Sequence, residues 1–128
     1  MNLLLDTHAL LWYAIGDPRL SPTARNAIAD ANHRVAMSVV SAWEIAIKLS
    51  SGKLQLDLNF REFVDGCTST YQFVWLPVEP RHLVTVRSLP FYHRDPFDRM
   101  LIAQALTDDL TLVSTDTVFD TYAAKRLW

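Results

Sequence analysis

Two acidic residues in this sequence come directly after short apolar stretches that are typical of buried strands. Asp6 follows Leu3-Leu4-Leu5, and Asp116 lies just beyond Thr111–Ser114. Ligands of open parallel sheets bind outside the carboxyl ends of the strands, so both acids occupy positions where a site is expected. Each is followed by a threonine. Because Asp and Thr also cap helices, capping is the alternative role for either acid alone.

Glu44 is a third candidate because it is the only charged side chain between Val35 and Ile47. A carboxylate in such apolar surroundings is costly unless it is paired, hydrogen-bonded or bound to a metal. The alternative is an exposed ion pair with Lys48, one helical turn later. An exposed pair contributes only ~0.3–0.5 kcal/mol, which is a weak reason to interrupt an apolar stretch. We therefore favour a functional role for Glu44.

Asp98 is a fourth candidate, near the start of a predicted helix. Asp95 is the expected N-cap, with Pro96 at the first helical position. Asp98 either completes a capping box or projects into a shared site, and its position alone leaves both interpretations open. Basic side chains flank it and either contact a phosphate backbone or form an ordinary solvated helix start: His93, Arg94 and Arg99.

Four carboxylates that converge would repel one another, and a divalent cation would remove that repulsion. Oxygen ligands alone select a hard ion, Mg²⁺ or Mn²⁺, rather than zinc. The natural chemistry of such a site is metal-assisted phosphodiester hydrolysis. If Asp6, Glu44, Asp98 and Asp116 converge, they are the candidate catalytic and metal-holding residues. Three hydroxyl residues either orient metal-bound waters or form turns: Thr7, Ser114 and Thr115.

The elements that must position these acids alternate between strands and helices. Strands are predicted at Asn2–Leu5, Val35–Met37, Phe73–Val78 and Thr111–Ser114, with a final short strand within Tyr122–Trp128. Helices are predicted at His8–Ile15, Thr23–Ala31, Ala42–Leu49, from Asn59 to about Thr70, at Pro80–Ser88, and after Asp95. This alternation predicts a three-layer α/β/α sandwich with a central, mainly parallel sheet. The order of the strands does not follow from it.

Composition limits the class of protein. A chain of 128 residues is expected to form one domain, residues 1–128. The single Cys67 excludes an internal disulfide and fits a reducing cytoplasm. No signal peptide or membrane-spanning stretch is expected. The net charge of −2 offers no bulk attraction for nucleic acid, so such binding must come from a local site. The four tryptophans are expected in the core or at an interface.

Four segments together resemble the PIN-domain ribonucleases, and more narrowly the VapC-type toxins of bacterial toxin–antitoxin pairs. They are Leu3–Ala9, Ser41–Lys48, Asp95–Ala105 and Leu112–Asp116. The resemblance covers essentially the whole chain. It implies that Asp6, Glu44, Asp98 and Asp116 match the family's acidic quartet, which holds one or two Mg²⁺ or Mn²⁺ ions.

The same resemblance implies a substrate and partners. The family cleaves RNA, and its toxins usually form homodimers that a small antitoxin neutralises by covering the active-site groove. For a dimer interface, we considered the apolar side chains of Trp12 and Tyr13 and the segment Asn59–Thr70. The core could equally absorb them.

Two alternatives belong to other classes. A receiver-like signalling domain would also bind Mg²⁺ with acids at strand ends. It would need two adjacent acids after the first strand and a lysine after a late strand, and this chain has neither. The second alternative is a catalytically silent binding module, which calorimetry with Mn²⁺ would distinguish.

Overall fold

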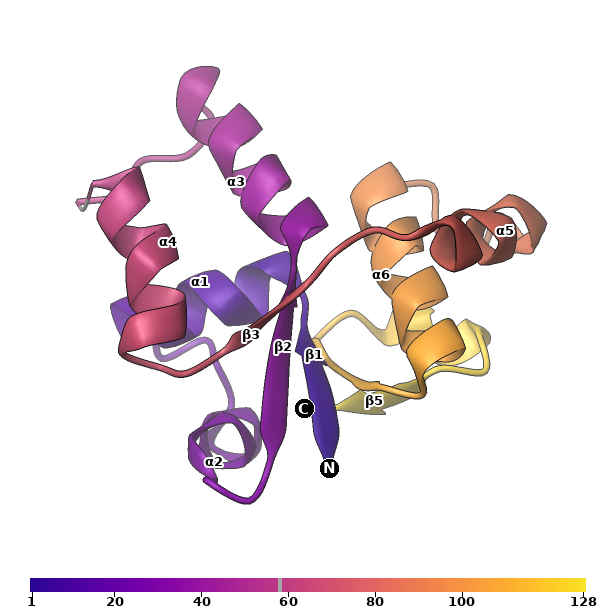
Figure 1. Ribbon diagram of the computed structural model, residues 1–128, viewed down its shortest axis with the longest axis horizontal. Helices are drawn as coiled ribbons and strands as arrows, with labels where there is room; N and C mark the ends of the chain where they lie inside the picture. Colours follow the sequence, from indigo (N-terminus) through magenta and orange to yellow (C-terminus); the bar gives the residue numbers. More distant parts are fainter. Residues whose placement is uncertain (58) are drawn as a thin grey trace.

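The structure is a computed structural model that describes residues 1–57 and 59–128. Its strands are β1 (Asn2–Leu5), β2 (Arg34–Ser38), β3 (Val74–Leu76), β4 (Thr111–Val113) and β5 (Lys125–Leu127). Its helices are α1 (Thr7–Ile15), α2 (Pro22–Ala29), α3 (Val39–Ser50), α4 (Phe60–Ser69), α5 (Pro80–Ser88), α6 (Pro96–Asp108) and the short 3₁₀ helix η1 (Thr117–Thr121). The predicted alternation of strands and helices is confirmed (Figure 1).

Several element bounds differ from the prediction by one or two residues, β3 being shorter at both ends, and two larger differences lie near the acids. Helix α3 begins three residues earlier than expected, because the Ser38 hydroxyl accepts a hydrogen bond from the backbone N–H of Val40 and caps the helix there. The 3₁₀ helix η1 was not predicted. It follows Asp116, whose carboxylate accepts the N–H of Val118.

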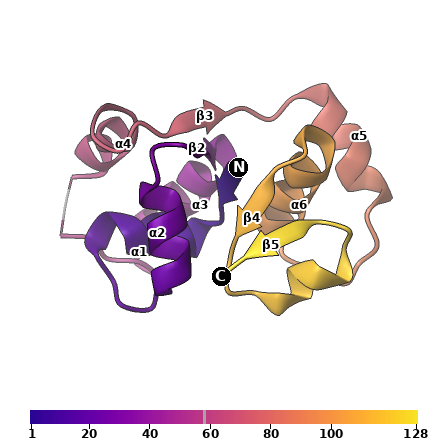
Figure 2. The ribbon, with the colours of Figure 1, turned by 90° about the horizontal axis from the view of Figure 1, so that it is seen from below.

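All neighbouring strands of the sheet are parallel, in the order β3-β2-β1-β4-β5. Seen from below, β3 and β5 lie at opposite edges (Figure 2). Leu5 pairs with Met37 of β2 and Val113 of β4, so the three central strands end side by side. The chain builds outward from β1 through β2 to β3, and then crosses back to β4 on the other side. The switch point, where ligands of open α/β sheets bind, therefore lies between β1 and β4.

The sheet is covered on both faces, which confirms the three-layer α/β/α arrangement. Alternate residues of β1 enter different cores: Leu3 and Leu5 pack with α1, α2 and α4, whereas Leu4 packs with α6 and η1. Figure 1 shows α1, α2 and α4 on one side of β1 and β2, with α5 and α6 on the other. Successive side chains of a strand point to opposite faces of the sheet, so Leu4 enters a different core from Leu3 and Leu5.

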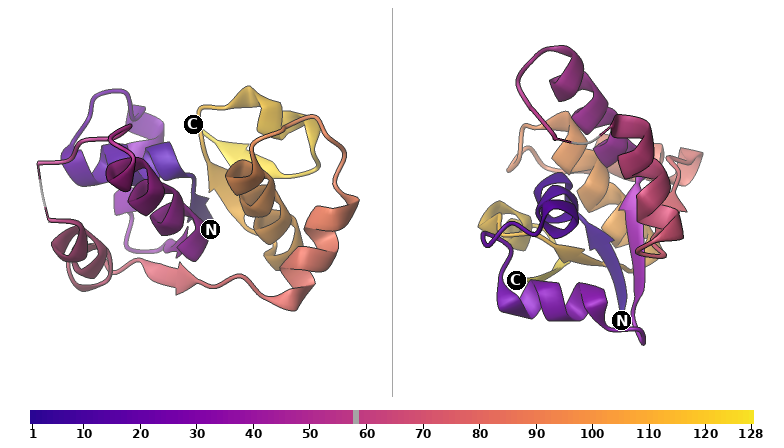
Figure 3. Two further views of the ribbon diagram at one scale, coloured as in Figure 1. Left: turned by 90° about the horizontal axis from the view of Figure 1, so that it is seen from above. Right: turned by 90° about the vertical axis from the view of Figure 1, so that its left-hand side faces the viewer.

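Helix α3 continues from the carboxyl end of β2 and rises beyond the sheet, where it contacts both α1 and α6. Figure 3, left, looks down on this edge of the molecule. The helix thereby carries its middle turn over the ends of the central strands. This placement brings the Glu44 side chain to the same edge as the side chains that follow β1 and β4.

Most of the apolar residues that we considered for an interface pack against the core instead. Trp12, Tyr13 and Phe60 pack against the buried cluster on the α1 face. Trp43 is instead 59% exposed, so it does not belong to the core. Cys67 is a buried free thiol, and burial raises its pKa to about 11. Within the described ranges, no helix is long and apolar enough to cross a membrane.

Candidate functional site

The four predicted acids meet at the carboxyl edge of the sheet, in a cavity of about 130 Å³. Asp6 follows β1, Glu44 lies in α3, Asp98 lies in the first turn of α6, and Asp116 follows β4. The cavity is lined by Asp6, Thr7, His8, Glu44, Lys48, Asp95, Asp98, Thr115 and Asp116. Carboxylates from four separate elements thus share one small space at the topological switch point.

Asp6 is buried and performs two roles. Its Oδ1 accepts a hydrogen bond from the backbone N–H of Ala9 at 2.8 Å, so it caps α1, as the alternative interpretation predicted. The side chain also lines the cavity. Burial raises the pKa of Asp6 above its ordinary value. The Ser114 hydroxyl opposes that shift, whereas the negative charge of Asp116 adds to it.

Glu44 is buried, and both of its oxygens have partners. The Thr7 hydroxyl donates to Oε1 at 2.7 Å, and the Lys48 ammonium lies 2.7 Å from Oε2. The ion pair between Glu44 and Lys48, which we considered as the alternative role of Glu44, therefore exists, but its carboxylate is not on the surface. The Glu44 side chain is only 7% exposed, against 38% for that of Lys48. Lys48 offsets part of the cost of burying the carboxylate.

Asp98 does not complete a capping box. The Asp95 carboxylate caps α6 by accepting the N–H groups of Phe97 and Asp98, at 2.8 and 3.2 Å. The Asp98 side chain lines the cavity instead. Burial raises the pKa of Asp98 to about 7; Asp95, Asp6 and Glu44 add to the rise and His93 opposes it. The site therefore holds more negative charge than its own cations compensate.

Asp116 approaches the cavity from the loop after β4. Its backbone N–H donates to the Ser114 hydroxyl at 3.0 Å, which fixes the turn. Oδ1 caps η1 by accepting the N–H of Val118 at 3.0 Å. Oδ2 lies 3.0 Å from Nε2 of His93. Asp116 therefore both caps η1 and lines the cavity, as Asp6 both caps α1 and lines it.

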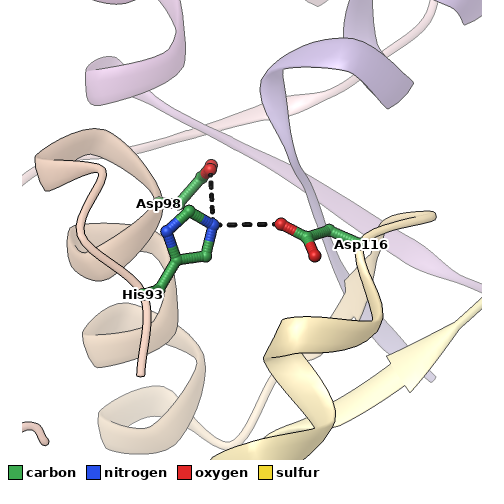
Figure 4. Close-up of side chains that lie close together, drawn as sticks. All are labelled: His93, Asp98 and Asp116. Carbon is green, nitrogen blue, oxygen red and sulfur yellow. Dashed lines mark hydrogen bonds and ion pairs between the residues drawn. The ribbon is translucent and has the colours of Figure 1, made fainter. Parts of the chain in front are cut away.

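His93 belongs to this site, although the sequence suggested it only as a contact to a phosphate backbone and not as a partner of the acids. Its Nε2 lies 3.1 Å from Oδ2 of Asp98 and 3.0 Å from Oδ2 of Asp116, between the two carboxylates (Figure 4). The residue precedes α6, outside any periodic element, so no spacing rule linked it to the acids. Its only signal was its place just before the Asp95 cap.

Arg99 does not face a phosphate backbone, and it is not part of a solvated helix start. Its guanidinium is buried and turns back toward the loop before α6. It donates to the backbone carbonyls of Val86, Leu89, Pro90 and His93. Four carbonyl acceptors use the planar fork of donors that only arginine offers. Arg94 remains exposed.

The donor set fits a hard divalent cation. The cavity is lined by Asp6, Glu44, Asp98 and Asp116, whose carboxylates are oxygen donors, and by Thr7 and Thr115. Oxygen donors of this kind suit Mg²⁺ or Mn²⁺. The raised pKa of Asp98 is what a site built for additional positive charge should display before the ion binds.

Comparison with known proteins places this arrangement in a family. The model of the PIN domain matches residues 3–125. The chain belongs to the PIN-domain family. This PIN domain is 28% identical over 116 residues to "Ribonuclease VapC22" of Mycobacterium tuberculosis (strain ATCC 25618 / H37Rv), a match that covers 90% of this chain and 87% of that protein. Membership of this family excludes the receiver-like alternative.

Solved structures support the fold of this PIN domain. A crystal structure of VapBC2 from Rickettsia felis, bound to a DNA fragment from their promoter, aligns with a TM-score of 0.75 at 14% identity and covers 99% of this chain and 98% of that one. A structure of VapBC-1 from nontypeable Haemophilus influenzae aligns with a TM-score of 0.64 at 16% identity and covers 99% and 97%. At these identities the likeness concerns the fold alone.

Proposed function

We propose that this PIN domain is a metal-dependent endoribonuclease and the toxin of a toxin–antitoxin pair. The observation that carries the proposal is the meeting of Asp6, Glu44, Asp98 and Asp116 in one cavity at the switch point of the sheet. The family membership and the relative named as a ribonuclease support it. We further propose that residues 1–128 act as one nuclease unit in the cytoplasm.

Asp6, Glu44 and Asp98 would hold the principal Mg²⁺ or Mn²⁺ ion, and Asp116 would complete a second-ion site or orient the attacking water. A divalent ion held there would polarise the phosphate and activate the attacking water. Asp6 or Glu44 would accept the proton of that water. The Lys48 ammonium, fixed beside Glu44 at the cavity wall, supplies a positive charge next to the bound phosphate backbone.

The proposal is tested by cleavage of an end-labelled RNA pool with purified protein. We expect Mg²⁺-dependent cleavage that EDTA abolishes, and that Asp6→Asn or Asp98→Asn reduces at least about 100-fold. Asp65→Asn is the matched control, since the Asp65 side chain is 70% exposed and lies in α4. Full activity in either site variant, or activity that survives EDTA, contradicts the assignment. A protein that neither cuts RNA nor binds Mn²⁺ in calorimetry is the silent binding module.

An antitoxin segment is proposed to cover a groove that joins the active-site cavity. This groove, of about 330 Å³, shares Thr7, His8 and Lys48 with the acidic cavity. Its other walls combine apolar and basic side chains: Leu11, Trp12, Ile15, Arg19, Lys53, Leu54 and Leu56. Such a surface is complementary to an amphipathic, acidic peptide segment. A peptide lying there would block access to the carboxylates. We call this surface the basic groove.

A homodimer is proposed through a different surface. A groove of about 500 Å³ lies between α3, α5 and α6, and only apolar side chains line it: Val39, Val40, Trp43, Val78, Leu83, Pro96, Phe97 and Met100. On α3, Val39, Trp43 and Ile47 are exposed in a row at intervals of one helical turn. A surface without charge offers no contact to the RNA phosphates, whereas a second copy presents the same apolar surface to it. We call this surface the apolar groove.

A further inference from the structure

His93 connects two of the four carboxylates across a gap between two elements. It lies in the loop before α6, with Asp98 in the first turn of that helix and Asp116 in the loop after β4. One ring nitrogen, Nε2, lies 3.1 Å from Oδ2 of Asp98 and 3.0 Å from Oδ2 of Asp116 (Figure 4). One nitrogen and two carboxylate oxygens, all within 4.8 Å of one another, also match a mixed metal-ligand set. The question is whether Nε2 offers a lone pair or a proton.

The opposite ring nitrogen decides this question. Nδ1 accepts a hydrogen bond from the backbone N–H of Asp95 at 3.2 Å. An acceptor at Nδ1 carries no proton, so the neutral ring has its proton on Nε2. In a capping box, the third residue of the helix would accept that same N–H of the cap residue. Here the third residue is Asp98. Because His93 takes over the N–H of Asp95, the Asp98 carboxylate is free to enter the cavity.

A metal ligand needs a lone pair on the coordinating nitrogen. Coordination through Nε2 would move the ring proton to Nδ1, which lies 3.2 Å from the backbone nitrogen of Asp95. Two N–H donors would then face each other, and the hydrogen bond would be lost. We propose that His93 is a positioning residue that donates its Nε2 proton to Asp116, with the Asp98 carboxylate held beside the same nitrogen, and that it is not a ligand of the metal. The proposal rests on the proposed function, since it assigns the metal to the carboxylates alone.

The rest of the ring's surroundings fix it in this role. The backbone N–H of His93 donates to the Tyr122 hydroxyl at 2.9 Å, and its carbonyl accepts from Arg99 at 3.3 Å. Tyr122 in turn donates to the carbonyl of Pro90 at 2.7 Å, within the same loop. The imidazole packs on Phe119 with the ring centroids 5.6 Å apart. The donor is therefore held rigidly before any ion binds, as a supporting residue around a metal site should be.

The deciding experiment is ¹⁵N NMR of the whole protein labelled at histidine, without metal and with saturating Mg²⁺. Long-range proton–nitrogen correlations report which ring nitrogen is protonated, and His93→Gln identifies the signal. We expect the proton on Nε2 in both states. Transfer of the proton to Nδ1 when Mg²⁺ binds would overturn the proposal and make His93 a ligand. A proton on Nδ1 in the metal-free protein would overturn it as well.

Calorimetry with two ions gives a second readout. Loss of a supporting donor lowers metal affinity about 10–100-fold. We expect His93→Leu to weaken Mg²⁺ and Mn²⁺ binding by the same factor, and His93→Gln, which keeps an amide donor, to recover most of the loss. Loss of a nitrogen ligand would instead weaken Mn²⁺ selectively, because imidazole favours transition metals. That result would contradict the proposal.

These outcomes are separable from failure of the proposed function. If the wild-type protein binds neither ion, the nuclease assignment fails, whereas the metal-free NMR spectrum still decides whether His93 is a donor. If both ions bind and RNA is cut, the proposed function holds. The ring nitrogen that carries the proton in the Mg²⁺-bound protein then decides whether His93 is a donor or a ligand.

Discussion

The Thr7 hydroxyl donates a hydrogen bond of 2.7 Å to Oε1 of Glu44, and so joins the first turn of α1 to the middle of α3. Thr7 directly follows Asp6, so the same turn that caps α1 also orients a carboxylate 37 residues away. Both groups are buried. The contact therefore couples the position of α3 to the end of β1, and we expect its loss to affect both stability and the site.

Thr7→Val keeps the shape of the side chain but removes the donor. A buried hydrogen bond to a charged group is worth about 1.5–3 kcal/mol, so we expect a loss of that order in the free energy of unfolding. RNA cleavage should also fall, because Glu44 loses the contact that fixes Oε1. Urea denaturation and a cleavage assay measure the two effects. Thr7→Ser, which retains a hydroxyl, is the control and should stay close to wild type. Equal effects of both substitutions would point to packing rather than to the hydrogen bond.

Asp98 should make the metal-free protein less stable as the pH rises. Its pKa is about 7 in the folded protein, against 3.8 for an ordinary aspartate. The folded state therefore binds this proton more tightly. The resulting stabilisation is complete below about pH 4 and is lost as the pH rises to 7. Above that, the ionised carboxylate costs folding free energy.

Asp98→Asn removes this cost. In EDTA we expect the variant to exceed wild type in unfolding free energy by roughly 1–3 kcal/mol at about pH 8. The advantage should shrink toward zero at about pH 4. Denaturant titrations at the two pH values provide the measurement. The prediction fails if the difference between variant and wild type is independent of pH.

Arg99 should be among the least replaceable residues outside the cavity. Arg99→Met removes the side-chain donor from four backbone carbonyls. Those of Pro90 and Val86 keep a second donor, but those of Leu89 and His93 have no other among the described residues, and we expect a loss of about 2–5 kcal/mol. Arg99→Lys keeps the charge but not the planar fork, so it should recover only part of the loss. The exposed Arg94 gives the matched control, since Arg94→Met should change stability by no more than about 0.5 kcal/mol. Thermal unfolding of the three variants tests this, and an Arg99→Met protein as stable as Arg94→Met would refute it.

The apolar groove and the basic groove should bind different partners, a second copy of this chain and the antitoxin respectively. Trp43→Lys places a charge in the apolar groove and should convert a dimer into a monomer, as measured by light scattering. Ile15→Glu alters the basic groove, where Ile15 is 47% exposed, and should leave the dimer intact. Because it removes an apolar contact and places a negative charge against an acidic segment, Ile15→Glu should instead weaken binding of the proposed antitoxin, measured by calorimetry. Each variant is the control for the other. A monomeric wild-type protein would exclude the homodimer, and the reverse pattern of effects would exchange the two surfaces.

Local rules predicted much of this molecule from its residues. Asp6 and Asp95 cap the helices that follow them, because each side chain accepts N–H groups only two or three residues away. Apolar segments with helices between them predicted a parallel sheet, since such strands need crossover connections. The acids at strand ends followed from the same reasoning. All of these inferences use interactions that are short in sequence.

The rest depended on contacts between distant segments. The order β3-β2-β1-β4-β5 decides that the residues after β1 and β4 are neighbours, and no local pattern contains that order. The direction of the Arg99 side chain and the exposure of Trp43 depend on which loop and which helix lie beside them. His93 joins the site only because the loop before α6 meets the loop after β4. The sequence by itself determined which groups could do chemistry, because side-chain chemistry is local. Only the tertiary structure decided which of them meet, because that depends on how the helices pack across both faces of the sheet.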